Sequence, residues 1–216
     1  MNVYFISGMC VNCKVFDRIE LPPGFERKYM EWRVPAGNES LEEYARTLAE
    51  EIDSERPFML AGYSLGGIVM QEMNKFMRPR RNILISSIKS KEEIPALFRI
   101  AKASHIPEYI PKELYVPHKN LSGLFIRLVY DMSVEEILRY VSCTSPEYMK
   151  WATCRITTWE PQVLCENLYH IHGTKDQIFP YRLIKDAYTI KGGDHLMVIK
   201  RADEVSRIFW EILLTE

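Results

Sequence analysis

The sequence predicts an α/β fold with a mostly parallel sheet of about six strands, helices on both faces and a helical cap insertion. Three observations predict it. Short apolar runs alternate with amphipathic stretches at both ends of the chain, this alternation breaks at about residues 88–162, and a glycine-rich turn at residues 62–67 joins an apolar run to a helical pattern. With 216 residues, we expect a single domain over residues 1–216 that carries the cap at about 88–162.

The first part of the chain predicts two strands and one helix. Residues 3–6 form a short apolar run, and residues 25–32 form a second candidate strand behind a Pro-Pro-Gly turn. Ser40 is followed three residues later by Glu43, which is the spacing of a capping box at the start of a helix. Apolar residues then recur at helical spacing, and we expect this helix to end near Asp53.

The next elements lie on either side of the glycine-rich turn. Residues 58–61 are apolar and predict a buried strand, and residues 68–77 have the spacing of a helix that Pro79 ends. Residues 82–87 contain a further apolar run and predict a second buried strand. This succession of strand, turn, helix and strand is typical of a parallel α/β sheet.

Prolines interrupt the inserted segment, and regular elements return after it. Helical patterns cover residues 96–103 and 133–141, the second of which opens on a Ser133–Glu136 capping box. We interpret the prolines at 107, 111, 117 and 146 as separators between helical patches. The last part of the chain predicts strands at 168–171 and 188–190 and a terminal helix at 202–214.

Composition excludes several classes of function. Lys and Arg number 28 against 29 Asp and Glu, so the net charge of -1 gives no electrostatic reason to expect a nucleic acid or an anionic membrane as partner. The uncharged run at residues 57–71 is too short for a membrane span and contains three glycines. The N-terminus has no signal-peptide pattern, which favours a cytoplasmic location, and an odd number of cysteines, five, favours reduced thiols.

A Gly-x-Ser-x-Gly pattern occupies residues 62–66, directly after a predicted strand and directly before a predicted helix. A nucleophilic serine needs a sharp turn in this context, and the small residues on either side of it prevent clashes. An unassisted serine hydroxyl is a poor nucleophile and needs a histidine base that a carboxylate holds in place. Asp176 follows one late strand and His195 follows the next, while Asp194 is a competing carboxylate whose position next to His195 makes it less suitable.

Together these segments resemble the α/β-hydrolase superfamily, and in particular a small serine esterase or thioesterase. The matching pieces are Gly-Tyr-Ser-Leu-Gly-Gly at 62–67, His-Gly-Thr-Lys-Asp at 172–176 and Gly-Asp-His at 193–195, in the chain order that this fold uses. The resemblance implies that Ser64 is the nucleophile, that His195 is the general base and later the acid, and that Asp176 orients the imidazole.

The resemblance also implies an oxyanion hole built from backbone N–H groups. One donor would be Leu65, the residue after the nucleophile, and the other would be Met9 in the loop after the first strand. That loop reads Ser7-Gly8 where many relatives have His-Gly, so the chain departs from the family pattern here. The implied reaction cleaves a small-molecule carboxylic ester or thioester through an acyl-enzyme, with no organic cofactor and no metal.

Other interpretations of the same residues stay open. A Ser-His-Asp triad also serves acyl transfer, lactone opening and carbon–carbon bond hydrolysis, and a hydrolase fold can bind a ligand or partner without catalysis. Cys10 and Cys13 form a Cys-x-x-Cys pattern, which thioredoxin-like redox proteins place between a strand and a helix. We favour small residues in a tight loop, because no second cysteine pair completes a zinc site.

The remaining histidines and the large aromatic residues are assigned structural roles. His170 and His172 alternate along one predicted strand, and we place one on each face of the sheet, with His172 in a packing role. His105 and His118 lie near prolines and are expected to be solvated. The aromatic residues of the insertion are candidates for an acyl pocket but are more typical of a core: Tyr109, Tyr115, Tyr130, Tyr140, Tyr148, Trp151 and Trp159.

Overall fold

The computed structural model describes residues 1–115, 133–162 and 165–215. Its six-stranded sheet has the order β2-β1-β3-β4-β5-β6, and every neighbouring pair of strands is parallel. This confirms the predicted fold class. The strands are β1 (Asn2–Ile6), β2 (Glu26–Met30), β3 (Phe58–Tyr63), β4 (Asn82–Ile85), β5 (Leu168–Gly173) and β6 (Tyr188–Ile190).

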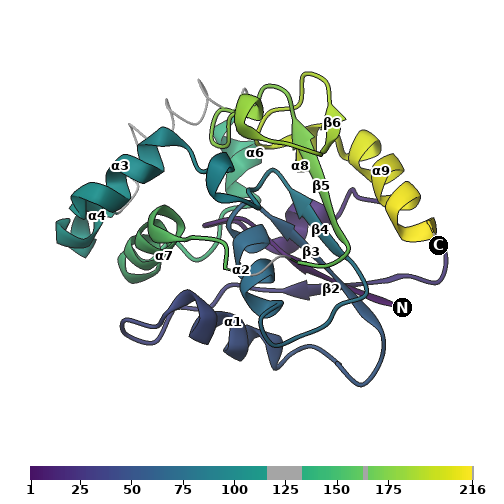
Figure 1. The fold of residues 1–216 in the computed structure, drawn as a ribbon, viewed down its shortest axis with the longest axis horizontal. Helices are drawn as coiled ribbons and strands as arrows, with labels where there is room; N and C mark the ends of the chain where they lie inside the picture. The colour runs from purple at the N-terminus through teal and green to yellow at the C-terminus, as the bar shows by residue number, and fades with distance from the viewer. Residues whose placement is uncertain (116–132, 163–164, 216) are drawn as a thin grey trace.

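Helices cover both faces of the sheet (Figure 1). On one face lie α1 (Leu41–Ala49) and α2 (Leu65–Met73), and on the other lie α8 (Met197–Lys200), α9 (Ala202–Leu214) and the 3-10 helix η1 (Cys13–Phe16). Side chains of β1 alternate between the two cores, as a strand's period of two requires: Tyr4 and Ile6 face α1 and α2, while Val3 and Phe5 face α9. Among the described helices, none has the length and apolar character needed to cross a membrane.

The first helix is shorter than the sequence predicts. Ser40 and Glu43 form the expected capping box, with the Ser40 hydroxyl accepting from the Glu43 N–H at 3.1 Å and the Glu43 carboxylate accepting from the Ser40 N–H at 2.7 Å. The helix ends at Ala49 rather than near Asp53, because the last residues turn through i to i+3 bonds. The Asp53 N–H donates instead to the hydroxyl of Tyr4.

The second helix begins earlier than expected. It starts at Leu65, immediately after Ser64, and ends at Met73 rather than Met77. The glycine-rich segment is therefore divided between the end of β3 and the first turn of α2, with Ser64 between them, and is not a separate loop. Gly66 and Gly67 belong to α2 itself, which brings the helix N-terminus directly against the end of β3.

The insertion between β4 and β5 is helical where it is described. It contains α3 (Ala96–Ser104), α4 (Ile106–Tyr109), α6 (Val134–Leu138) and α7 (Pro146–Thr158), with the 3-10 helices η2 (Lys91–Glu93) and η3 (Lys112–Tyr115); η4 (Tyr181–Leu183) follows β5. Pro107 and Pro146 occupy first-turn positions of α4 and α7, so they begin helices rather than separate them. Pro117, His118 and Tyr130 lie outside the described residues.

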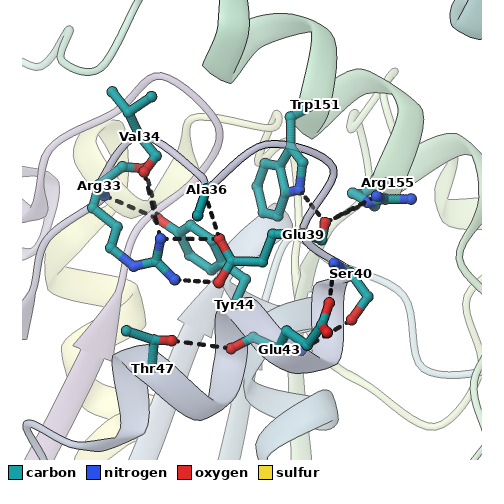
Figure 2. A network of polar contacts seen from close by, with 10 residues as sticks. All are labelled: Arg33, Val34, Ala36, Glu39, Ser40, Glu43, Tyr44, Thr47, Trp151 and Arg155. Carbon is teal, nitrogen blue, oxygen red and sulfur yellow. Dashed lines mark hydrogen bonds and ion pairs between the residues drawn. The ribbon is translucent and has the colours of Figure 1, made fainter.

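Helix α7 is fixed to the segment between β2 and α1. The Trp151 indole donates to the Glu39 carbonyl at 2.7 Å, and the Arg155 guanidinium donates to the same carbonyl and to Asn38 (Figure 2). The Glu39 carboxylate in turn holds Arg33 in a bidentate ion pair. Three helices of the insertion, α3, α4 and α7, lie together on the side of the molecule away from both chain termini (Figure 1).

The capping box of α1 provides a first test of this account. Ser40→Ala is expected to destabilise the protein by about 1 kcal/mol, because it removes an acceptor from an N–H group that the helix itself cannot satisfy. Urea unfolding should show a lower midpoint with an unchanged slope. Ser54→Ala is the control, since Ser54 is exposed and its hydroxyl has no hydrogen bond within the described chain; equal midpoints for the two variants would contradict the assignment.

Candidate active site

Functional side chains gather where the parallel strands end. The strand register aligns Ile6 with Gly62, Tyr63 with Ile85, and Ile85 with Ile171, so the carboxyl ends of β1, β3, β4 and β5 form one edge. The strand β2 lies on one side of β1, and the next strand in the sequence, β3, lies on the other side of β1. The strand order therefore reverses between β1 and β3, which makes the carboxyl ends of these two strands a topological switch point. Ligands of open α/β sheets bind at such points.

Ser64 occupies a strained turn between β3 and α2. Its backbone has φ 53° and ψ −119°, a conformation that costs a non-glycine residue on the order of 1–3 kcal/mol. The turn is tight enough that a side chain at Gly62 would place its Cβ 2.5 Å from the Gly66 carbonyl oxygen. A Cβ at Gly66 would collide with the carbonyl oxygens of Ile6 and Ser7. Both glycines of the motif are therefore required by close backbone approach.

Neighbouring groups hold the Ser64 backbone in this conformation. Its N–H donates to the Ile85 carbonyl at 3.0 Å, continuing the ladder between β3 and β4. Its carbonyl accepts from the Ser87 hydroxyl at 2.8 Å and from the Gly67 N–H at 3.0 Å. These bonds satisfy both backbone polar groups of Ser64 and stabilise its strained conformation. None of them uses the side-chain hydroxyl.

The loops after β5 and β6 are bonded to each other and bring Asp176 and His195 together. The Lys175 N–H donates to the Gly193 carbonyl at 2.8 Å, and the Thr174 hydroxyl accepts from the Gly192 N–H at 2.8 Å. The Asp176 carboxylate is fully buried and accepts from the backbone N–H groups of Ile178 and Phe179, both at 2.9 Å.

A continuous chain of hydrogen bonds joins the three predicted side chains. His195 Nδ1 lies 2.9 Å from Asp176 Oδ2, and His195 Nε2 lies 3.0 Å from Ser64 Oγ. An ionised carboxylate only accepts hydrogen bonds, so Nδ1 carries the proton and Nε2 presents its lone pair to the serine hydroxyl. This is the arrangement in which an imidazole removes a proton from a serine.

Opposing effects set the pKa of Asp176. Burial alone would raise it, but the nearby His195, with its charge and hydrogen bond, His172 and the Phe179 N–H together lower the pKa below its usual range. The carboxylate is therefore ionised at neutral pH. Asp194, the competing carboxylate, accepts from Lys200 Nζ at 2.7 Å and from the Leu196 N–H at 3.0 Å, and not from the imidazole.

Two backbone N–H groups near Ser64 have no acceptor among the residues that the structure describes. Leu65 is the first residue of α2, and the first N–H groups of a helix have no intrahelical partner. Met9 lies in the loop after β1, and within residues 1–115, 133–162 and 165–215 its N–H has no hydrogen bond. A Cβ at neighbouring Gly8 would lie 3.3 Å from Ser64 Cβ, so this loop approaches the serine closely. The partial positive charge of the α2 N-terminus adds to an anion-stabilising environment.

Solved structures resemble this chain over nearly its whole length. A thermophilic esterase from Thermogutta terrifontis matches 99% of the chain and 89% of its own at 18% identity and a TM-score of 0.68. Bacillus megaterium epoxide hydrolase in complex with an inhibitor matches 99% and 93% at 14% identity and a TM-score of 0.72. An alpha/beta hydrolase fold protein from Burkholderia ambifaria matches 97% and 90% at 10% identity and a TM-score of 0.71.

The chain has the α/β-hydrolase fold. Neither a protein-family model nor a curated protein sequence matches it. The likeness is therefore one of structure, at identities that show the fold alone.

The structure corrects the prediction for His170 and His172. These residues lie two apart on β5, and their rings are 5.1 Å apart, so both face the same side of the sheet. The prediction of opposite faces is wrong because side chains alternate with a period of two. His172 Nε2 lies 2.8 Å from the Phe179 carbonyl and 3.6 Å from Asp176 Oδ2, which places it beneath the acid loop of this hydrolase fold.

The two cysteines of the Cys-x-x-Cys pattern do not form a pair. Cys13 belongs to the core under α9, whereas Cys10 packs against the core on the opposite face. Burial raises the pKa of the Cys10 and Cys13 thiols to about 12, so both are protonated at neutral pH. In the part of the chain that the structure describes, no three His, Cys, Asp or Glu side chains converge as metal ligands would.

Ser87, Phe179 and Trp32 contribute to this site and were not found from the sequence. Ser87 holds the Ser64 carbonyl, and its place just after an apolar strand is a signal that pointed to this edge. Phe179 donates its N–H to Asp176, and its ring lies 5.7 Å from the His195 ring and 5.9 Å from that of Phe98 in α3. Trp32 donates from its indole to the Gly8 carbonyl, a contact between distant segments that no motif indicates.

The buried histidines predict a stability that falls in mild acid. Burial, with further contributions from His172 and Lys89, holds the pKa of His170 well below its usual range, and burial likewise lowers the pKa of His172. Below about pH 6.5 these two histidines bind protons in the unfolded chain but stay neutral in the folded chain. Stability is therefore complete above that pH and is lost as the pH falls towards the folded pKa values.

His170→Asn is expected to reduce this loss by up to about 1.4 kcal/mol per pH unit, the contribution of one proton. Free energies of unfolding in urea, measured from about pH 7 to about pH 5.5, test this expectation. His105→Asn is the control because His105 is exposed. The same pH slope in wild type and His170→Asn would contradict the assignment.

Proposed function

We propose that this protein is a serine hydrolase that cleaves a small carboxylic ester or thioester through an acyl-enzyme. The observation that carries the proposal is the hydrogen-bonded chain Asp176–His195–Ser64, with Ser64 at a strained turn. A binding protein would have no need for a buried, ionised carboxylate that orients an imidazole towards a serine hydroxyl. The cytoplasmic location expected from the sequence stays a prediction.

In the first half of the proposed reaction, Ser64 Oγ attacks the substrate carbonyl carbon while His195 Nε2 takes the hydroxyl proton. Asp176 stabilises the imidazolium that results and keeps Nδ1 protonated. The negative charge on the carbonyl oxygen is stabilised by the N–H groups of Leu65 and Met9. When the tetrahedral intermediate collapses, His195 gives its proton to the departing alcohol or thiol, and the acyl group stays on Ser64.

In the second half, a water molecule attacks the acyl carbon and His195 Nε2 takes its proton. Collapse of the second intermediate breaks the bond to Ser64 Oγ, which recovers the proton from the imidazolium, and the carboxylic acid leaves. Each step uses only residues of this chain and water. The mechanism requires no metal and no organic cofactor.

The surroundings of His195 support a substrate with an apolar acyl part. Phe179 is fully buried against the imidazole, and Phe98 of α3 packs its ring at a right angle to that of Phe179. An apolar boundary beside the base favours hydrocarbon over charged groups, since an unpaired charge buried there would lose its hydration.

Ser64→Ala is expected to lower the hydrolysis of short-chain p-nitrophenyl esters to about one thousandth of the wild-type kcat/KM or less, because the nucleophile is lost. Rates with a thioester such as acetylthiocholine should fall in parallel. Far-UV circular dichroism should be unchanged. Ser54→Ala serves as the matched control, and a Ser64→Ala protein with wild-type activity would overturn the proposal.

A second pair of variants separates the two carboxylates beside His195. Asp176→Asn is expected to lower kcat on the order of 10³-fold, because an amide N–H can donate to Nδ1. The imidazole proton then sits on Nε2, which still faces Ser64 but can no longer accept the hydroxyl proton. Asp194→Asn should keep a kcat close to wild type, since its carboxylate contacts Lys200 and not the imidazole. The reverse ranking in a steady-state assay would transfer the orienting role to Asp194.

A further inference from the structure

Gly8 and Met9 share a peptide bond whose orientation is fixed from both sides of the carbonyl. The Gly8 oxygen accepts from the Trp32 indole at 2.8 Å and from the Val11 N–H at 3.1 Å. A carbonyl oxygen has two acceptor lone pairs, so these bonds fill its capacity. This peptide plane is therefore held in place and not free to rotate.

The direction of the Met9 N–H follows from that of the Gly8 carbonyl. In a trans peptide the two groups point in opposite directions, and the structure contains no cis peptide among its described residues. The sheet order β2-β1-β3 places Trp32, which follows β2, on one side of the end of β1, and Ser64, which follows β3, on the other side. With the carbonyl turned towards Trp32, the Met9 N–H is turned towards Ser64.

We propose that Trp32 is a positioning residue of the oxyanion hole: its indole N–H holds the Gly8–Met9 peptide so that the Met9 N–H points to the carbonyl oxygen of the substrate. This inference rests on the proposed function, because it concerns the donor that the hydrolytic mechanism assigns to Met9. It also explains how the loop keeps its shape with Ser7 where many relatives have histidine.

Trp32 is itself held by residues from two other parts of the fold. Its ring lies 5.8 Å from that of Tyr44 in α1 and 5.8 Å from that of Tyr148 in α7. The indole is also buried, so these ring contacts hold it beside the Gly8 carbonyl. An aromatic cluster formed by Trp32, Tyr44, Tyr148 and Trp151 thus connects α1 and the inserted helix α7 to the oxyanion loop.

Trp32→Phe tests the role of the indole N–H with the ring position kept apolar. Loss of an oxyanion donor lowers kcat about 10²–10³-fold, and Trp32→Phe, which only releases the donor's peptide, is expected to lower kcat about tenfold with little change in KM. The affinity of an aryl trifluoromethyl ketone, which forms a tetrahedral oxyanion on serine, should fall by the same factor.

Trp151→Phe is the matched control. Its indole also donates to a main-chain carbonyl, but that carbonyl belongs to Glu39 and not to the oxyanion loop (Figure 2). Its ring packs in the same aromatic cluster. Both variants lose one indole-to-carbonyl hydrogen bond, so their melting temperatures should fall by similar amounts. Only Trp32→Phe should lose kcat and affinity for the ketone.

Each outcome has a distinct meaning. Wild-type protein that hydrolyses no ester and binds no ketone would overturn the proposed function, and the role of Trp32 with it. Active wild type with equal kcat in Trp32→Phe and Trp151→Phe would overturn the role of Trp32 alone. If Trp32→Phe does not fold, 3-benzothienylalanine at position 32 keeps the shape of the indole and removes only the N–H, and the same kinetic comparison with wild type decides the matter.

Discussion

The backbone of Ser64 is the constraint on which the site depends. A residue with φ 53° and ψ −119° is unfavourable by itself and persists only where its surroundings enforce it. Here β3 ends and α2 begins on either side of that one residue, and Gly66 packs against the carbonyls of Ile6 and Ser7. Ser87, two residues after the end of β4, donates its hydroxyl to the Ser64 carbonyl. The sheet thus stabilises a turn that directs one hydroxyl to the imidazole of His195 at the switch point and leaves the N–H of Leu65 beside it.

The other parts of the site lie on loops, yet each loop is bonded to a second one. The Asp176 loop is joined to the His195 loop through Lys175 and Gly193, and the oxyanion loop is joined through Trp32 to the segment that follows β2. The insertion contributes to both arrangements, since Phe98 contacts Phe179 and Tyr148 contacts Trp32. Such cross-connections give short loops the rigidity that electrostatic stabilisation of a transition state requires.

Local patterns account for what the sequence predicts well. The Ser40 capping box, the apolar runs of the strands and the Gly-x-Ser-x-Gly turn each depend on residues a few positions apart, so they can be recognised in one chain. Trp32 and Phe179 were missed because their roles arise from contacts between separate segments. Pro146 was misread because a proline that ends one pattern can also be the first residue of a helix.

Chemical labelling of the native protein with a fluorophosphonate tests the central claim most directly, because this reagent reacts with a serine only when a base and an oxyanion hole act on it together. Mass spectrometry of the digested product then identifies the modified residue. The account predicts one phosphonyl group per chain, on the peptide that contains Ser64, and its absence from His195→Ala. A folded wild-type protein that stays unlabelled, or that carries the group on another residue, would contradict it.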